Sequence, residues 1–428
     1  MIILPMLINK NFKISIPLNR KKSRFFTLLI IASLFISFSI YFSYYLNSPI
    51  NPSEIPRINI TCQEELNSED YVNCTFELIG SDESERILPM NSEIKVRGFF
   101  NARLPKKGYR IELSRRISLL GMRKDDDWLL FAMFLDLPHM RIKLSFDLWR
   151  RLYSQNPTAI LPDSKYVSLY INGKFHGIYL LAEKNDRRLF ELNDPQNNIM
   201  SSLIFQAGSH ETNFIGYTNG DWEQKWPNED DDYYIMDDIM IELTLFIRNS
   251  NNSEFFSHTS GIYSKFNKLN LIDFYLFNFF ILHKDFWSQN YFLVRNDNPS
   301  KFFLIPWDFD SSFGQYLDRK YSSQEDPTSD IISRNYLFSR LLNNEEFKID
   351  VINRWFQLRK DLWTAEFILD EVSEMYEEIK DILEVDAEMW YSKIFQENWE
   401  EELDEAIKYL FDWIPKRLQF CDMYFSEF

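Results

Sequence analysis

The 428-residue chain contains few of the residues from which metal and thiol sites are built, with only three cysteines and five histidines. It has no C-x-x-C pair, no histidine-rich cluster and no H-E-x-x-H motif. Zinc sites depend on such groupings, so the sequence argues against a zinc protein. Because a Ser-His-Asp order is also missing, a hydrolase built on paired carboxylates is a poor interpretation.

Positive charge is scarce as well. The chain has 47 Lys and Arg residues against 64 Asp and Glu residues, which gives a formal net charge of −17 at pH 7. A protein this acidic repels nucleic acid and anionic lipid, and the basic patch of a nucleic-acid binder is missing. We therefore expect no nucleic-acid partner. The acidity could favour basic substrates, although solubility alone would explain it.

The first 24 residues are an exception, because they carry six basic residues and no acidic one. They precede Phe25–Leu46, a run without any charge, and a polar linker at residues 47–54. A helix of roughly 20 apolar residues can cross a bilayer, and the basic flank predicts a cytoplasmic tail at residues 1–24. No small-x-small site follows the run, which favours an uncleaved signal anchor over a cleaved signal peptide. The sequence thus predicts a single-pass membrane protein with an extracytoplasmic domain.

The three cysteines fit this prediction. Cys62 and Cys74 fall in two adjacent strand-like runs, and an extracytoplasmic location would permit a disulfide between them. The spacing alone does not decide whether they pair. Cys421 would then be free, and in an apolar C-terminal helix we expect it to serve in packing.

The first half of the remaining chain has the periodicity of β-strands. Apolar and polar positions alternate between turn residues from residue 55 to 113, as in an antiparallel β-layer. Residues Met140–Leu152 place apolar side chains on one face of a helix. Residues Tyr166–Ala182 are predicted to form a hairpin, because Asn172-Gly173 at their centre is a strong hairpin-turn signal. Residues 55–190 therefore form the β-rich part of the predicted domain, which extends over 55–428.

The second half is richer in helical patterns. Residues 191–342 hold the motifs described below and an acidic stretch, 217–262, that is typical of a surface insertion; it could also be a substrate-binding lobe. From 343 to 428 apolar residues recur at roughly 3.6-residue spacing, which predicts helices packed around an ordinary core. A β-rich first half and a helix-rich second half indicate an α+β fold.

Two short stretches carry the oxygen-bearing side chains that phosphoryl transfer requires. They are His283-Lys-Asp285-Phe-Trp-Ser-Gln-Asn290 and Trp307-Asp308-Phe-Asp310. Protein kinases use H-R-D-x-x-x-x-N followed by D-F-G, in which the first Asp accepts the substrate proton and the Asn and second Asp bind metal ions. The same five-residue step separates Asp285 from Asn290.

The sequence between these stretches predicts how they come together. Tyr291–Arg295 and Phe302–Pro306 are typical of two strands around the turn Asn296-Asp-Asn-Pro299. The side chains before and after such a hairpin can converge on one Mg²⁺, which prefers oxygen ligands. Taken alone, the two motifs are equally well interpreted as structural turns, because Asp and Asn are common turn formers.

The chain from Ile55 to about Gly314 resembles one family along its length. Besides His283–Asn290, the resembling stretches are Ile94–Gly98 with Pro105–Leu113, Leu119–Met122 with Asp125–Trp128, Met140–Leu144, Tyr170–Lys184 and Pro306–Gly314. They resemble, in the same order, the CotH kinase family, named for spore coat protein H. The resemblance implies an atypical, two-lobed protein-kinase-like fold, here preceded by the predicted transmembrane helix.

The resemblance also implies roles for the acidic motif residues. Asp285 is the expected catalytic base or hydroxyl-positioning residue, and Asn290 and Asp308 are the expected metal ligands. Asp310 is either a further metal contact or the cap of the following segment. His283 stands where kinases have a structural histidine, so we expect no catalytic role for it.

Phosphate binding requires cations, and Lys107 is the first candidate because it precedes a predicted strand. An exposed hairpin lysine is the alternative interpretation. The other cations in resembling stretches are Arg97, Lys106, Arg110 and Arg141. Arg141 could instead pair with Glu183 or a backbone carbonyl.

Two further positions bear on nucleotide binding. Glu183 and Lys184 correspond to the kinase hinge and are expected contacts of adenine or ribose, unless they form a surface ion pair. Phe99 and Phe100 stand where the family has Asn and small hydroxyl residues, and their rings cannot donate hydrogen bonds to phosphate. Either backbone N–H groups hold the phosphates or the site is degenerate.

The leading hypothesis is therefore a membrane-anchored, extracytoplasmic kinase that uses ATP with Mg²⁺ or Mn²⁺. Its expected partners are secreted or surface proteins phosphorylated on Ser or Thr. The alternative is a surface structural or adhesion protein that keeps the scaffold without turnover, because one fold can host several functions.

Overall fold

The computed structural model describes residues 55–98, 101–209, 212–218, 220–228, 236–283, 289–315, 335–395 and 398–428. All of them belong to one compact unit, Ser53–Phe428. The predicted tail, apolar run and linker at residues 1–54 lie outside the described residues.

Seven described strands close into a barrel in the order β1-β2-β3-β4-β5-β7-β6. Their bounds are β1 Arg57–Cys62, β2 Val72–Ile79, β3 Ile87–Arg97, β4 Gly108–Ser118, β5 Lys124–Phe131, β6 Ser164–Ile171 and β7 Lys174–Glu183. Neighbouring strands are antiparallel except β1 and β6, which pair in parallel with Ile58 opposite Leu169. The alternating side chains of β1 and β2, such as Ile58 and Phe76, are buried in a shared core.

Local turn chemistry fixes the β6–β7 hairpin, and the prediction for Tyr166–Ala182 is confirmed. Asn172 (φ 49°) and Gly173 (φ 76°) both adopt the left-handed conformation that a two-residue hairpin turn requires.

The structure also decides whether Cys62 and Cys74 pair. They are register partners on β1 and β2 and form a disulfide, with their Cα atoms 4.4 Å apart.

A second, four-stranded antiparallel sheet has the order β11-β10-β8-β9. Its strands are β8 Leu203–Ala207, β9 Trp222–Trp226, β10 Tyr291–Arg295 and β11 Phe303–Pro306. The predicted hairpin of β10 and β11 is confirmed, although β11 begins one residue later than expected.

Helices form the rest of the unit. They are α2 Arg141–Arg151, α3 Asp237–Asn249, α4 Asn252–Phe255, α5 Ile262–Lys265, α6 Lys268–Phe280, α8 Tyr336–Leu342, α9 Glu345–Asp361, α10 Ala365–Phe395 and α11 Trp399–Glu427. The short 3₁₀ turns are η1 Glu83–Glu85, η2 Asn101–Arg103, η3 Leu152–Ser154 and η5 Phe309–Ser311. The predicted helix at Met140–Leu152 is confirmed by α2 and η3.

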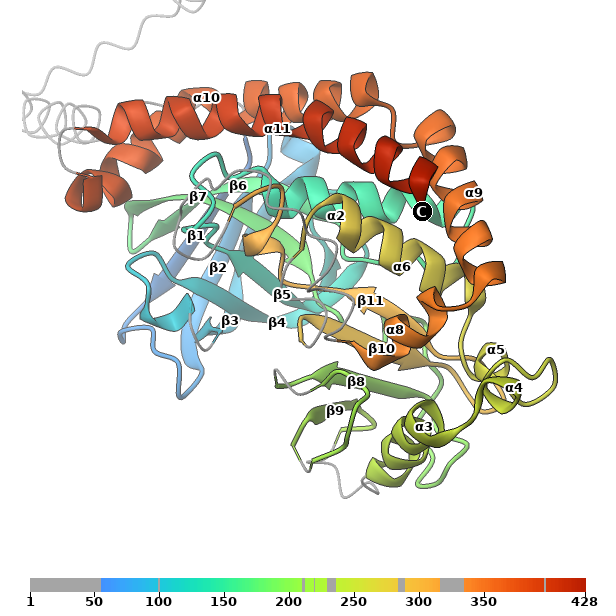
Figure 1. Ribbon diagram of the computed structural model, residues 1–428. Helices are drawn as coiled ribbons and strands as arrows, with labels where there is room; N and C mark the ends of the chain where they lie inside the picture. The colour runs from blue at the N-terminus through green and yellow to red at the C-terminus, as the bar shows by residue number, and fades with distance from the viewer. Residues whose placement is uncertain are drawn as a thin grey trace, which may run out of the picture. The chain divides into compact units, whose positions relative to one another are not determined.

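The helices differ in how they are buried. Figure 1 shows α10 and α11 running side by side, with α10 also in contact with strand β7 of the barrel. Every residue of helix α6 from Asn270 to Phe280 is buried, and the helix packs against both β11 and α9. Cys421 is buried in α11, where burial raises the pKa of its thiol to about 11, which is consistent with a packing role.

The predicted fold requires a correction. The protein is α+β with a helical C-terminal region, but its first seven strands form a closed barrel rather than the β-lobe of a two-lobed kinase-like fold. The parallel pairing of β1 with β6 closes the barrel, and it joins strands about a hundred residues apart in sequence. Alternating hydrophobicity identifies a strand but does not identify such a distant partner.

The predicted transmembrane helix and single-pass localisation also require a correction. No helix in the described part of the chain is long and apolar enough to cross a membrane. The longest helices, α10 and α11, have sufficient length, but charged residues occur along both, including Glu400, Glu401 and Glu402 in the first turn of α11. The membrane span was predicted at Phe25–Leu46, which lies outside the described residues.

Candidate functional site

A cavity of about 830 Å³ lies between the barrel and the four-stranded sheet. The barrel contributes residues of β3, β4, β5 and the segment after β7, and the sheet contributes residues of β8, β9 and β10. Although the chain is acidic overall, six basic residues line the cavity: Arg97, Arg110, Lys184, Arg187, Arg188 and Lys225. Its size is within the range of small-molecule sites in proteins.

Two of these cations share one carboxylate on the barrel wall. Arg110 donates two hydrogen bonds to Asp127, from Nε at 2.9 Å and from Nη2 at 2.7 Å. Lys184 Nζ donates to the same carboxylate at 2.5 Å. Burial acts to lower the pKa of Arg110, but the contact with Asp127 outweighs it, so the pKa is raised and the guanidinium stays charged. These cations therefore have fixed positions at the cavity.

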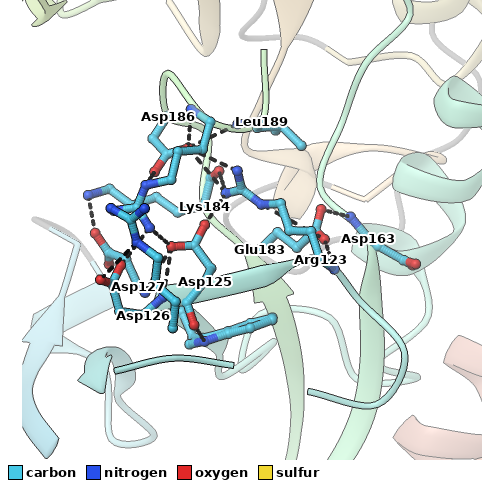
Figure 2. Close-up of polar contacts among 12 residues, drawn as sticks. Arg123, Asp125, Asp126, Asp127, Asp163, Glu183, Lys184, Asp186 and Leu189 are labelled. Carbon is cyan, nitrogen blue, oxygen red and sulfur yellow. Dashed lines mark hydrogen bonds and ion pairs between the residues drawn. The ribbon is translucent and has the colours of Figure 1, made fainter. Parts of the chain in front are cut away.

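The other aspartates of the Asp125-Asp-Asp127 motif anchor the segment after β7, as Figure 2 shows. Arg188 contacts both Asp125 and Asp126, and Arg123 Nη2 lies 2.9 Å from Asp125 Oδ2. Arg123 also contacts Asp186 Oδ1 at 3.1 Å. Burial opposes ionisation of Asp126, but hydrogen bonding to Arg188 outweighs it and lowers the pKa of Asp126 to about 2. The network fixes residues 183–189 against β5.

Glu183 belongs to this network rather than to the cavity lining. Its carboxylate accepts hydrogen bonds from the backbone N–H of Arg123 (2.9 Å) and of Asp163 (3.1 Å), as Figure 2 shows. The side chain is buried and holds two loops together. Lys184, the neighbouring residue that was also predicted to contact nucleotide, does line the cavity.

The β10–β11 hairpin brings the predicted metal ligands to one end of the sheet. Trp307 N donates to Asn290 O at 2.8 Å, so Asn290 and Trp307 form the last hydrogen-bonded pair of the hairpin and Asp308 follows directly. Asn290 and Asp308 have a left-handed backbone, with φ of 62° and 63°, which Asn and Asp tolerate better than other non-glycine residues. Strained backbone of this kind often marks functional positions. The Asp308 side chain is exposed.

His283 supports this loop. Its Nε2 donates to Asp308 O at 2.9 Å, and its Nδ1 lies 2.9 Å from the side chain of Asn278. Burial lowers the pKa of His283 to about 4, although the hydrogen bond to Asp308 opposes the shift. His283 is therefore neutral near pH 7 and holds the backbone of Asp308, which agrees with the structural role expected for it.

Arg97 connects the barrel to the same loop. Its guanidinium lies 4.2 Å from the ring centroid of Phe131 and lines the cavity at the end of β3. Burial lowers the pKa of Arg97, while the carboxylates of Asp308 and Asp310 act in the opposite direction. Arg97 and Asp310 also line a second, small cavity of about 20 Å³. Predicted residues from β3 and from the loop after β11 are thus neighbours.

The adjacent lysines 106 and 107 have different surroundings. Lys107 Nζ donates to Ala102 O at 2.5 Å, and Lys107 is not one of the residues that line the large cavity. Lys106 is fully buried and donates to Asp386 Oδ1 at 2.6 Å and to Ile178 O at 2.7 Å. The prediction that Lys107 binds phosphate remains a prediction.

Asp386 lies on α10, and it forms with Lys106 and His139 a fully buried group that we call the Lys106 cluster. His139 Nε2 lies 2.9 Å from Asp386 Oδ2 and 3.2 Å from Lys106 Nζ. Burial lowers the pKa of Lys106, with Asp386 opposing. Burial acts to raise the pKa of Asp386, but the charge of Lys106 and the contact with His139 outweigh it, so that pKa is lowered. The cluster joins α10 to the barrel.

Arg141 is likewise enclosed. It is fully buried at the start of α2, and its Nη1 donates to Asp136 Oδ1 at 2.6 Å. It does not line the large cavity. Catalytic candidate Asp285, and Phe99 and Phe100, lie outside the described residues.

The sequence did not single out Asn185 or Asp386. Asn185 lines the cavity and directly follows the predicted pair Glu183 and Lys184, so extending the resembling segment by one residue would have included it. Asp386 is 280 positions from Lys106 and carries no local signal.

The described residues are compatible with a nucleotide and a divalent cation. Asn290, Asp308 and Asp310 offer the amide and carboxylate oxygens that Mg²⁺ prefers, and the charges of Asp308 and Asp310 act on the cation Arg97. Among the described residues no cluster of three or more His, Cys, Asp or Glu side chains forms a metal site by itself. A bound cation would therefore need oxygens from its nucleotide or from water, as Mg²⁺ sites usually do.

Comparisons with known proteins give the family. Inner spore coat protein H of Bacillus subtilis is 25% identical over 277 residues, which cover 60% of this chain and 68% of that protein. Two solved structures are weakly similar. The HipA–HipB toxin–antitoxin complex of Shewanella oneidensis with its operator DNA has 14% identity and a TM-score of 0.29 over 73% of this chain and 68% of the other. The Helicobacter pylori proinflammatory kinase CtkA has 11% identity and a TM-score of 0.25 over 86% and 99%.

The TM-scores are too low to carry an argument about the fold. The family comparison is decisive, because residues 94–421 match the family described as CotH kinase protein, and these residues include both cavities and the Lys106 cluster. The chain is a kinase-like protein that belongs to the CotH kinase protein family.

Proposed function

We propose that the protein is an ATP-dependent protein kinase that transfers phosphate to Ser or Thr side chains of other proteins. One observation carries the proposal. The cationic wall of an 830 Å³ cavity ends at Arg97, beside the loop that bears Asp308 and Asp310. Cations beside hard oxygen ligands are what a nucleoside triphosphate requires.

Different residues of the chain would bind the phosphates, attract the nucleotide and hold the metal ion. Arg97 would bind phosphate oxygens, and Lys184 and Arg110, oriented by Asp127, would attract the nucleotide to the barrel wall. Asn290 and Asp308, with Asp310, would hold Mg²⁺ or Mn²⁺, which neutralises phosphate charge when bound. His283 keeps Asp308 in place and is neutral near pH 7.

Asp285 is the proposed proton acceptor for the substrate hydroxyl. This role rests on the motif, in which an Asp precedes the metal-binding Asn by five positions. An aspartate within reach of a hydroxyl positions it and accepts its proton during transfer.

The test uses purified full-length protein with labelled ATP, Mg²⁺ or Mn²⁺, and a mixture of protein substrates. In Asp308→Ala, metal-dependent nucleotide binding and phosphorylation should fall together, because a metal ligand is lost. In Asp285→Asn, binding should survive while turnover falls by roughly two to four orders of magnitude, the usual range for general-base help. Asp404→Ala, an exposed position on α11, is the control.

Circular dichroism should show all three variants folded. If the wild type phosphorylates no protein and Asp308→Ala binds nucleotide as the wild type does, the kinase proposal is wrong. The second candidate, a scaffold without turnover, would then stand, and the bulky Phe99 and Phe100 beside Gly98 favour it.

A further inference from the structure

Arg97 differs from the other basic residues of the large cavity in how its charge is balanced. Within the described part of the chain, its guanidinium makes no hydrogen bond and no ion pair, and its close contact is the ring of Phe131, whose centroid lies 4.2 Å away. Each of the other five basic residues that line the cavity forms an ion pair with an Asp or Glu: Arg110, Lys184, Arg187, Arg188 and Lys225. Arg97 can therefore bind an anionic ligand without giving up an existing pair.

The side chain of Arg97 reaches Phe131 across a neighbouring strand. Arg97 lies on β3 and Phe131 on β5, and β4 runs between these two strands. Gly108 of β4 is the register partner of Arg97. A Cβ atom on Gly108 would lie 3.2 Å from Arg97 Cγ and 3.1 Å from Leu130 O, closer than ordinary van der Waals contact. The absence of a side chain at Gly108 therefore leaves the space in which the Arg97 side chain lies.

Phe131 is itself fixed by aromatic neighbours. It is 7% exposed, and its ring meets those of Trp307 and Phe146 edge to face, with centroids 5.7 Å and 5.8 Å apart. Trp307 directly precedes Asp308 in the chain and stacks on Phe146 of α2. Because a ring packed in this way cannot easily turn, it holds the guanidinium at a fixed place relative to the loop that bears Asp308.

We propose that Gly108 and Phe131 position Arg97 for the phosphates of the bound nucleotide. Gly108 provides the space, and the face of the Phe131 ring attracts the guanidinium. This inference rests on the proposed nucleotide-binding function and adds two positioning residues to it, neither of which lines the large cavity. Without them, Arg97 would be free to take other rotamers, including those turned toward Asp308 and Asp310, whose charges act on it.

Titration calorimetry with full-length protein and Mg²⁺ measures the affinity for ATP and for inorganic tripolyphosphate. Phe131→Leu keeps an apolar side chain but removes the ring, and it should weaken the binding of both ligands roughly 2- to 10-fold, the cost of immobilising one flexible side chain on binding. Gly108→Ala should weaken both by a similar factor, because the added methyl group displaces Arg97. Phe131→Tyr retains the ring and should bind both ligands as the wild type does.

Phe76→Leu is the matched control for lost packing. Phe76 is fully buried in the same barrel and lines neither cavity. The substitution should lower the temperature of thermal unfolding, because a buried ring is lost, and should leave the affinities for ATP and tripolyphosphate unchanged. Circular dichroism shows whether each variant is folded.

A double-variant cycle separates positioning from a general loss of packing. In an Arg97→Ala background, Phe131→Leu should cause no further loss of affinity, because the residue through which Phe131 acts is gone. Wild-type affinity in Phe131→Leu, or the same loss with and without Arg97, would overturn the positioning role and leave nucleotide binding intact. If the wild type binds neither ATP nor tripolyphosphate, the proposed function itself fails.

Discussion

The Lys106 cluster and the cavity residues Arg110 and Lys184 both contain basic side chains paired with aspartate, but the two groups differ in their exposure. Lys106, His139 and Asp386 are fully buried and bonded mainly to one another, whereas Arg110 and Lys184 are about 30% exposed and face a cavity. A closed cluster cannot contact a ligand without breaking its own pairs, and desolvated charges without partners are costly. The difference indicates that exposure to the cavity, rather than membership of a family motif, separates candidate binding residues from structural ones.

Lys106 and Lys107 form the sharpest part of this comparison, because they are adjacent in one motif. The larger effect on stability is expected for the Lys106 cluster. Lys106→Met removes the cationic partner of the buried Asp386, which keeps only its contacts with His139 and the backbone N–H of Ile178, and should lower the free energy of unfolding by about 3–5 kcal/mol. Lys107→Met, the matched control, should change it by about 0.5 kcal/mol or less. Urea unfolding of the purified protein measures both.

Asp386→Asn tests whether the cost comes from the pair. Its effect and that of Lys106→Met should not add in the double variant, because both substitutions remove the same contact. Additive effects would show that the two residues act independently and that the buried cluster is not a unit.

A second prediction concerns the buried His283, which contacts Asn278 of α6 and the backbone carbonyl of Asp308 in the loop after β11. Its pKa is about 4 in the folded protein and about 6.5 when unfolded, so between these values the unfolded chain binds more protons. Stability should therefore fall as the pH is lowered, by about 2 kcal/mol between pH 7 and pH 5. In His283→Asn this part of the pH dependence should disappear, with His258→Asn as the exposed control.

Urea unfolding at both pH values provides the measurement. Because His283→Asn also removes the hydrogen bond to Asp308 O, the comparison is between slopes against pH and not between absolute stabilities. An unchanged slope in His283→Asn would mean that the pKa of this histidine is the same in the folded and unfolded protein, so that burial does not lower it.

The smallest expected effect is on the affinity for ATP, and it tests whether Arg97 or Lys107 contacts the phosphates. Arg97→Ala should weaken ATP binding roughly tenfold, because a charge-assisted contact is lost, without unfolding the protein. Lys107→Ala should weaken it less, since Lys107 Nζ is bonded to Ala102 O. Titration calorimetry with ATP and Mg²⁺ measures both. A larger loss in Lys107→Ala would restore Lys107 as the phosphate contact and would weaken the inference from exposure to the cavity.

Features that depend on near neighbours were predictable from the sequence. The turn at Asn172-Gly173, the amphipathic helix from Met140, and the hairpin that brings Asn290 and Asp308 together all agree with the structure. In each case the residues that fix the element lie within about twenty positions of one another. The structural role expected for His283 also agrees, although only the structure shows that its partners are Asp308 O and Asn278.

Contacts between distant segments were decided only by the tertiary structure. Barrel closure through β1 and β6 and the pairing of Lys106 with Asp386 have no signature in local periodicity. The sequence determined which side chains carry the charges and oxygens that phosphate and metal ions require. Burial then decided which of them face the cavity, because Lys106 is enclosed with its partner Asp386 and cannot reach a ligand, whereas Arg110 and Lys184 are partly exposed at the cavity.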